Sequence, residues 1–384
     1  MSEWQELTFG EITEPVKNTY LPKSDEQLAY IGLEHIEQET LRLAGVGKSS
    51  DVTSNKFKFE VNDVLFGKLR PYFRKVYKPK FSGICSTDIW VFRAKKGFLQ
   101  DFLFYFLASW DFVDTANSGE GGTRMPRADW NFLKTTSWLV PYKEEQKAIA
   151  SVLSSLDDKI DLLHRQNTTL ERMAETLFRQ WFLEDALEDW EEVQIPKLFD
   201  IRDGTHDSPK QKTIGKPLIT SKHIIGNRLD FESAYLISDE DFDKINQRSK
   251  VDKNDILISM IGTIGLIYLE QTDAVNYAIK NVGLFKTSQN PTWMAYTYFW
   301  LKSNFGRQFL DEHISGSTQE YVSLGSFRSI TFKKPPIEKL EEFNKIANGY
   351  LHKIKNNSAQ IQTLEKLRDN LLPKLMSGEI RVNH

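Results

Sequence analysis

The chain carries two copies of one sequence pattern, and each copy covers about half of its 384 residues. The run Asn62–Leu65 reads Asn-Asp-Val-Leu and returns as Asn-Asp-Ile-Leu at Asn254–Leu257, 192 positions later. Further matches follow in the same order at offsets of 193 to 195: Ile89–Arg93 with Val282–Lys286, Leu107 with Leu301, Gly122–Arg124 with Ser317–Gln319, Pro141 with Pro336, and Lys159–Ile160 with Lys353–Ile354. Solenoid repeats have periods of roughly 20–50 residues. The long period therefore indicates the duplication of a whole module.

Each copy joins a segment of mixed character to a segment with helical periodicity. Runs rich in β-branched and aromatic residues, bounded by glycine and proline, predict strands at 88–93 and 255–261. Glycine and proline are absent from Glu144 to Trp181, which favours one long helix there.

Both helical segments carry an apolar seam with the heptad spacing of a coiled coil. In the first segment the seam residues are Ile149, Leu153, Leu156, Ile160, Leu163, Asn167, Leu170, Ala174, Leu177 and Trp181. In the second segment they are Ala347, Tyr350, Ile354, Asn357, Ile361, Leu364, Arg368, Leu371 and Leu375. Because so narrow an apolar stripe must be covered by another helix, we expect the two segments to pack against each other.

An antiparallel register in which paired residue numbers sum to 524 aligns the two seams. Asn167 then faces Asn357, and this polar layer would determine the register at some cost in stability. Leu156 faces Arg368, whose guanidinium we expect to reach out to solvent.

The sequence thus predicts an α+β fold, with two mixed α/β domains in a pseudo-twofold arrangement separated by an antiparallel two-helix coiled coil. The expected bounds are 1–141 and 187–336 for the domains, and 142–186 and 337–384 for the helical spacers.

Composition limits the cellular compartment of the chain and the kinds of cross-link or metal site that it can contain. The sequence has no apolar run near the ~18 residues of a membrane-spanning helix, and Met1–Gln5 does not resemble a signal peptide. The single cysteine, Cys85, rules out an internal disulfide and a cysteine-based zinc site. We therefore expect a cytoplasmic chain that holds no metal.

Charge is distributed unevenly, although the net charge is only −3. Eleven basic and three acidic residues lie between Lys56 and Lys96, with aromatic residues interleaved, and Ser208–Leu229 holds five basic residues and no acid. Basic side chains can contact phosphates, and planar side chains can pack on sugars and bases. A solvated charged face is the simpler interpretation, and both interpretations stay open at this point.

The sequence lacks a catalytic constellation. Gly45–Ser49 resembles the end of a phosphate-binding loop, but Arg42 stands where that motif needs its first glycine. The only Pro-Pro pair, Pro335–Pro336, lacks the flanking residues of a methyltransferase motif. His206 and His223 are candidate metal ligands or base readers, although stabilising a turn is the commoner role of a lone histidine.

In combination, these motifs resemble the specificity subunits of type I restriction-modification systems. The resemblance spans essentially the whole chain. It is carried by the two Asn-Asp-(Val/Ile)-Leu motifs and by the following segments: the turns Gly122–Arg124 and Gly316–Gln319, the helix entries Pro141–Gln146 and Pro336–Glu338, the loops Asp203–Pro209 and Ser259–Gly265, and the helix endings Leu177–Phe182 and Leu371–Leu375.

The resemblance implies a non-catalytic subunit that binds double-stranded DNA. Each mixed domain would read one half of a split, asymmetric target. The coiled coil would set the gap between the halves and dock the methylating subunits. Two modification subunits would carry S-adenosylmethionine and methylate adenine, and two restriction subunits would use ATP and Mg²⁺ in phage defence. The chain itself would need no cofactor.

The segment after each Asn-Asp pair is the best candidate for base reading. Phe66–Arg74 aligns without gaps to Ile258–Leu266, and the copies diverge there while their flanks agree. Two different half-sites would require such divergence, although neutral drift in a surface loop would also produce it. Arginine and lysine suit guanine edges, and glutamine suits adenine. The candidate DNA contacts are Lys68, Arg70, Tyr72, Arg74, Lys75, Arg124, His206, Lys210, Lys222, Arg228, Ser259, Thr263 and Gln319.

Two other functions fit parts of the pattern. A duplicated scaffold could recruit proteins through its coiled coil without binding DNA, but the paired basic stretches argue against it. An enzyme in its own right would need the catalytic residues that the sequence lacks.

Overall fold

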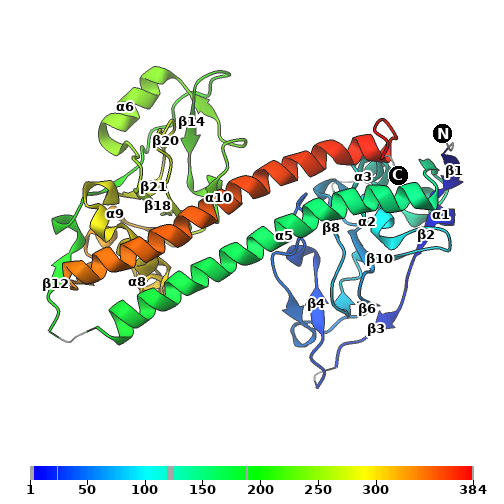
Figure 1. The fold of residues 1–384 in the computed structure, drawn as a ribbon, viewed down its shortest axis with the longest axis horizontal. Coiled ribbons are helices and arrows are strands. Elements are labelled where there is room, and N and C mark those ends of the chain that lie inside the picture. The colour runs from blue at the N-terminus through cyan, green and yellow to red at the C-terminus, as the bar shows by residue number, and fades with distance from the viewer. Residues whose placement is uncertain (1–3, 24, 119–124, 187–188, 383–384) are drawn as a thin grey trace. The chain divides into compact units, whose positions relative to one another are not determined.

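The computed structural model describes residues 4–23, 25–118, 125–186 and 189–382. The chain forms two compact units (Figure 1): unit 1 comprises residues 1–161 and 362–384, and unit 2 comprises residues 162–361. The long helices α5 (Lys143–Arg179) and α10 (Ile337–Met376) each contribute to both units. None of the helices in the described ranges combines the length and the apolar character that crossing a membrane requires.

Unit 1 is built on two main sheets, with strand orders β2-β10-β7-β8 and β3-β6-β9-β4-β5. The strands of the first sheet are β2 (Thr13–Pro15), β10 (Ile89–Ala94), β7 (Val64–Gly67) and β8 (Val76–Tyr77). Those of the second are β3 (Thr19–Tyr20), β6 (Lys56–Phe59), β9 (Gly83–Cys85), β4 (Ala29–Ile31) and β5 (Gly47–Lys48). Only β4 and β9 pair in parallel among these strands.

The core of unit 1 is aromatic and lies between the first sheet and its helices. The helices are α1 (Phe9–Ile12), α2 (Gln100–Ala108), α3 (Trp110–Ser118) and α4 (Trp130–Leu133), and β1 (Gln5–Thr8) pairs with β11 (Ser137–Val140). Phe9, Phe66 and Phe112 are fully buried there together with Leu153 of α5 and, nearly so, Leu372 of α10. The sheet and the long helices of this unit therefore share one core.

Unit 2 repeats this plan. Its sheets have the orders β13-β21-β18-β19 and β17-β14-β20. The strands are β13 (Ile201–Asp203), β21 (Val282–Phe285), β18 (Ile256–Ser259), β19 (Ile267–Leu269), β17 (Leu236–Ile237), β14 (Lys216–Ile219) and β20 (Ala278–Ile279). The helices are α6 (Asp239–Ser249), α7 (Met294–Lys302), α8 (Asn304–His313) and α9 (Leu324–Arg328). Three short pairs complete the unit: β12 (Glu192–Gln194) with β24 (Thr331–Lys333), β15 (Ile224–Ile225) with β16 (Arg228–Leu229), and β22 (Ile314–Ser315) with β23 (Tyr321–Val322).

The four-stranded sheets and one parallel strand pair correspond between the two units, as the duplication predicts. β10 pairs with β2 and β7 in unit 1 as β21 pairs with β13 and β18 in unit 2. The parallel pair β4–β9 has its counterpart in β14–β20. In both units the turn after the first strand of this parallel pair contains a histidine that accepts a hydrogen bond from the backbone N–H three residues before it. His35 accepts from Gly32 at 2.9 Å, and His223 accepts from Thr220 at 2.8 Å. His223 therefore stabilises a turn.

The long helices pack antiparallel in the predicted register. In unit 2, Asn357 Nδ2 donates to Asn167 Oδ1 at 2.8 Å. These two residue numbers sum to 524, as predicted. In unit 1, Asp157 pairs with Arg368, one step from that sum. All predicted seam residues are buried or half-buried. α10 ends where expected, since Gly378 follows it in the left-handed conformation (φ 74) that favours glycine.

The prediction that the Arg368 guanidinium reaches solvent was wrong. Its side chain is only 2% exposed, and its Nη1 lies 2.9 Å from Asp157 Oδ1. Asp369 also contacts it, with 3.2 Å between Arg368 Nη2 and Asp369 Oδ1. Two carboxylates compensate the charge, so the residue can stay inside.

Candidate nucleic-acid interface

One end of each four-stranded sheet is held by the Asn-Asp motif. Asn62 (φ 69) and Asn254 (φ 72) take the left-handed conformation that asparagine tolerates in turns. The next carboxylate is buried in both units. In unit 1, Asp63 accepts from the Glu60 N–H at 2.7 Å and from Arg93 Nε at 2.6 Å. The motif therefore forms a turn and an ion pair with the neighbouring strand β10.

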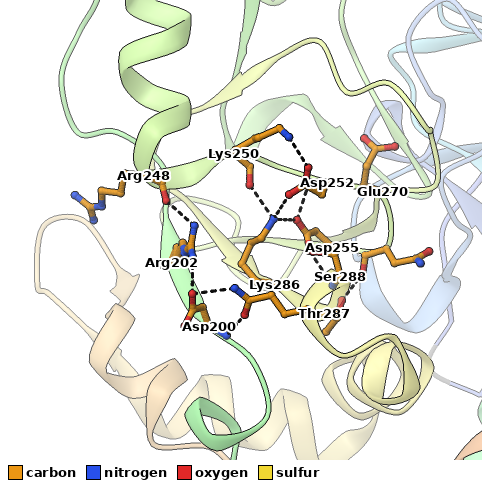
Figure 2. Close-up of polar contacts among 12 residues, drawn as sticks. Asp200, Arg202, Arg248, Lys250, Asp252, Asp255, Glu270, Lys286, Thr287 and Ser288 are labelled. Atoms are coloured by element: carbon orange, nitrogen blue, oxygen red, sulfur yellow. Dashed lines mark hydrogen bonds and ion pairs between the residues drawn. The ribbon is translucent and has the colours of Figure 1, made fainter.

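Unit 2 has the same arrangement with a lysine in place of the arginine (Figure 2). Lys286 Nζ bonds to Asp255, lies 2.7 Å from Asp252 Oδ2, and donates to Lys250 O at 3.0 Å. Burial alone would raise the pKa of Asp252, but hydrogen bonds from Lys286 and Lys250 hold it below its usual value. Because every charge here is paired and Lys286 is 5% exposed, this end of the sheet is structural.

The opposite end of each sheet carries loops, and we call it the loop end. In unit 1 the first reading loop, residues 68–75, connects β7 to β8. Leu69 forms a β-bridge with Arg127, and the Arg70 N–H donates to Pro126 O at 2.8 Å. The Lys68 N–H donates to Asp88 O at 2.9 Å, just before β10. The loop thus lies against the segment 125–128, which directly follows the predicted turn at Gly122–Arg124.

The loop end of unit 2 has the same construction. The second reading loop, residues 260–266, connects β18 to β19. Ile261 forms a β-bridge with Tyr321, and the Val322 N–H donates to Met260 O at 3.0 Å. In each unit the structure therefore brings the loop after the Asn-Asp motif against the segment that follows the glycine-containing turn in the sequence.

The aligned positions in the two loops share a backbone conformation that is rare for most residues. Gly262 has φ 78, and Arg70 at the aligned position has φ 52. A non-glycine residue in this region is strained and occurs often at functional sites. Nε of Arg70 is buried and has no hydrogen-bond partner among the described residues, while its guanidinium carbon lies 6.0 Å from the centre of the Phe73 ring.

The candidate contacts of unit 1 divide into two groups. Lys68 and Arg70 are half-buried and Tyr72 is exposed, so all three lie at the surface of the first loop end. Lys75 instead donates inward to Leu33 O, and burial lowers the pKa of both Lys68 and Lys75. Arg74 is a correction, because its side chain is 2% exposed and too deep to touch DNA. Arg124 lies outside the described residues.

In unit 2, Thr263 and Gln319 are exposed at the second loop end. Ser259 is a correction, because it is fully buried: its Oγ donates to Thr263 O and accepts from the Leu266 N–H at 2.8 Å. It shapes the loop from inside and has no surface to offer to DNA.

The remaining candidates of unit 2 come from its other segments. His206 is placed by its two ring nitrogens, 2.8 Å from Asn281 Oδ1 and 2.9 Å from Asp203 Oδ2, and its side chain is 63% exposed. Asn281 directly precedes β21, so this histidine lies at the same end of the sheet as the second reading loop. Lys210 and Lys222 are exposed and Arg228 is half-buried.

Two residues of the loop ends were missed in the sequence. Arg127 is 52% exposed and lies 3.0 Å from Asp88. Tyr321, its counterpart in unit 2, is 43% exposed. Both follow the glycine-containing turns by a few positions, and that spacing was the signal that could have revealed them. Among the described residues, no group of three or more histidine, cysteine, aspartate or glutamate side chains could hold a metal ion.

Comparison with known proteins shows the family to which the chain belongs. The family model described as "Type I restriction modification DNA specificity domain" matches residues 1–172 and again 187–366. The MjaIX specificity subunit of Methanocaldococcus jannaschii is 24% identical over 75% of this chain and 71% of its own length. The HindI specificity subunit of Haemophilus influenzae is 21% identical over 99% of this chain and all of its own length. The solved S subunit of a type I system from M. genitalium shares the fold, with a TM-score of 0.57 at 15% identity over 97% of this chain and 96% of that one.

Proposed function

We propose, given that this chain belongs to the type I restriction-modification DNA specificity family, that each of its two units reads one half of a split DNA target. Members of this family supply the DNA specificity of a restriction-modification complex through two target-recognition domains. They are not catalytic, and the cofactors reside in the partner subunits. The reading of half-sites by particular loops is the proposed step.

The observation that carries the proposal is the contrast between the two ends of each sheet. The Asn-Asp end is built in the same way in both units, with a buried carboxylate paired to a basic residue of the next strand. The loop ends keep the same backbone connections but differ in side chains, as Arg70 and Gly262 illustrate. Two domains that read different half-sites require the same fold with different side chains at the surface that meets DNA.

The chemistry of the exposed side chains fits direct readout. In unit 1, Lys68 and Arg70 present donors that suit guanine O6 and N7, and Arg127 lies beside them. In unit 2, Gln319 suits adenine, while Thr263 can contact either kind of base. We assign Lys210, Lys222 and Arg228 to phosphate contacts, which position the protein on DNA without reading the sequence. Arg124, His206 and Tyr72 complete the proposed contacts.

In this proposal the recognition domains are residues 1–141 and 187–336, and the spacers are 142–186 and 337–384. The helix pair sets the gap between the half-sites and docks two modification subunits, and two restriction subunits complete the assembly. Such a complex works in the cytoplasm, where it meets double-stranded DNA.

The test is to compare Arg70→Ala with Gln319→Ala in the assembled complex. Sequencing of methylated adenines shows which target positions each variant relaxes. We expect Arg70→Ala to cost roughly 1–3 kcal/mol on the target and to relax one position in one half. Gln319→Ala should relax a position in the other half.

Lys222→Ala is the matched control, because a phosphate contact weakens binding to all sequences alike and lowers the salt dependence. Equal losses on target and random DNA for Arg70→Ala would remove this residue from base reading. Binding that does not weaken as salt rises would favour the protein scaffold instead.

A further inference from the structure

The first reading loop is held at its end by a buried charge. Arg74 has a left-handed backbone (φ 46), and its Nε donates to Ala108 O, at the end of α2, over 2.6 Å. The guanidinium lies over the Trp110 ring, 5.2 Å from its centre. Its two terminal nitrogens lie 3.5 and 3.4 Å from Oδ1 of Asp369, a residue of α10 in the same unit. A side chain of the loop therefore reaches the long helix.

Asp369 continues these contacts to a second buried arginine. Arg368 Nε lies 3.2 Å from Asp369 Oδ1, and Arg368 Nη1 lies 2.9 Å from Asp157 Oδ1, on α5. Tyr105 of α2 donates to Asp157 Oδ2 at 2.7 Å. We call Arg74, Asp369, Arg368 and Asp157 the charged network. It joins the first reading loop to both long helices within unit 1.

The positive and negative charges of the network are equal in number, and its stability depends on each carboxylate staying beside its arginine. Its two guanidinium groups face two carboxylates, and both arginine side chains are 2% exposed. Burial lowers the pKa of Arg74, and the charge of Asp369 opposes that change. Removing Asp369 leaves the buried charge of Arg74 without its carboxylate, which is far more costly than the pair is stabilising. The loop cannot keep its position if that charge must move toward water.

Unit 2 has no such network at the equivalent positions. Leu266 aligns with Arg74, and Glu175 aligns with Asp369. The counterparts of Tyr105, Asp157 and Arg368 are Phe299, Leu351 and Ala174, so one acid of the network is kept but neither arginine is. Those three residues belong to the hydrophobic core of unit 2. The ion pair between Lys302 and Glu171 does join α7 to α5, but it does not include the second reading loop. That loop is closed by its own Ser259.

We infer that Arg74 and Asp369 are positioning residues for DNA reading. They make the conformation of the first reading loop depend on the helix pair of unit 1, and the second reading loop has no such dependence. This inference rests on the proposed function of the loop. A change in the packing of α10 against α5 within unit 1 then alters discrimination at one half of the target. The other half is read by a loop that no side-chain hydrogen bond or ion pair among the described residues joins to the long helices; Ser259 closes it from within.

The experiment uses the assembled complex with Asp369→Asn and with Arg74→Leu, which installs the residue found in unit 2. Sequencing of methylated adenines is expected to show about tenfold more methylation at sites mismatched in one half, the half that Arg70→Ala relaxes. The other half should stay as strict as before. Asp369→Glu keeps the charge and should restore discrimination. Glu171→Gln, which breaks the ion pair of unit 2, should relax neither half.

Hydrogen exchange of residues 66–77 provides a second measurement that does not depend on DNA. Asp369→Asn should speed exchange there and leave residues 258–269 unchanged. Unchanged exchange in 66–77, or equal relaxation of both halves, overturns the inference. If exchange rises while Arg70→Ala leaves both halves strict, the link to the helices stands and the proposed reading by this loop fails.

Discussion

Arg74 in unit 1 and Leu266 in unit 2 occupy the same place at the end of equivalent loops, yet they are held by different contacts. Arg74 is charged and reaches Ala108 and Asp369, which are distant in sequence. Leu266 is held through its backbone N–H by Ser259, seven residues away. The comparison teaches that one backbone path can be stabilised from outside or from within. Only the first of these two arrangements includes an ion pair to a long helix.

The Asn-Asp ends of the two sheets form a second comparison. Asp63 and Asp255 are both buried, but their partners differ in exposure: the Arg93 side chain is 40% exposed and the Lys286 side chain 5%. The same turn and the same ion pair therefore lie in different surroundings. An exposed partner can be replaced by water, whereas a buried partner cannot, so equivalent changes should have unequal effects.

The largest expected effect is that of Lys286→Met, which leaves Asp255 buried without its cation. We expect unit 2 to lose about 3–5 kcal/mol in free energy of unfolding. Arg93→Met should cost unit 1 only about 1–2 kcal/mol, because water can solvate the exposed edge of that site. Urea denaturation of the full-length chain, combined with hydrogen exchange of β18 and β7, measures the two effects separately.

Lys253→Ala is the control for this pair of variants. Lys253 pairs with Asp273 on the surface, where both side chains are at least half exposed, so its loss should leave the free energy of unfolding essentially unchanged. Equal costs for Lys286→Met and Arg93→Met would contradict the difference between the two sites.

An intermediate effect is expected at the aligned left-handed positions of the two reading loops. A Cβ at Gly262 would meet no atom within 4 Å, so Gly262→Ala tests backbone strain alone. It should destabilise unit 2 by about 1 kcal/mol. Arg70→Gly removes the same strain from unit 1 and should leave its stability unchanged or raise it by up to about 1 kcal/mol. Thermal unfolding compares the two, and a large loss of stability with Arg70→Gly would mean that its side chain holds the loop.

The smallest effect concerns acid stability. The pKa of Asp252 is lowered in the folded chain by Lys286 and Lys250, so its contribution is complete well above its ordinary pKa of 3.8 and is lost as pH falls through the folded value. Because the side chain is 42% exposed, screening should keep this contribution below about 1 kcal/mol. In the Asp252→Asn variant the free energy of unfolding of unit 2 should fall less steeply as the pH drops below about 4. If the variant loses stability at acid pH as steeply as the original chain does, Asp252 is not coupled to Lys286.

Local pattern was enough to predict much of the fold. The heptad seams placed α5 and α10 and their antiparallel register, because a stripe of apolar residues at that spacing can be buried in few ways. The offset of the repeat predicted two equivalent units. It also marked the segment 66–74 as the place where the copies differ.

The role of individual polar residues could not be predicted in this way. Arg74 lies in a basic, aromatic-rich stretch and was therefore taken for a DNA contact, yet its charge is compensated by Asp369, almost 300 residues later in the chain. Ser259 likewise was taken for a surface residue, although its hydroxyl closes a loop inside the protein. Arg127 and Tyr321 were overlooked because the sequence does not show the β-bridges to Leu69 and Ile261 that bring them to the loop ends; their short distance from the glycine-containing turns was the one signal.

The sequence by itself determined the duplication, the two helices and the register in which their seams meet, since these depend on periodic burial of apolar side chains. The tertiary structure decided which charges lie inside and which remain at the surface. Whether an arginine can be buried depends on the carboxylates that other segments bring to it, and no local pattern carries that information.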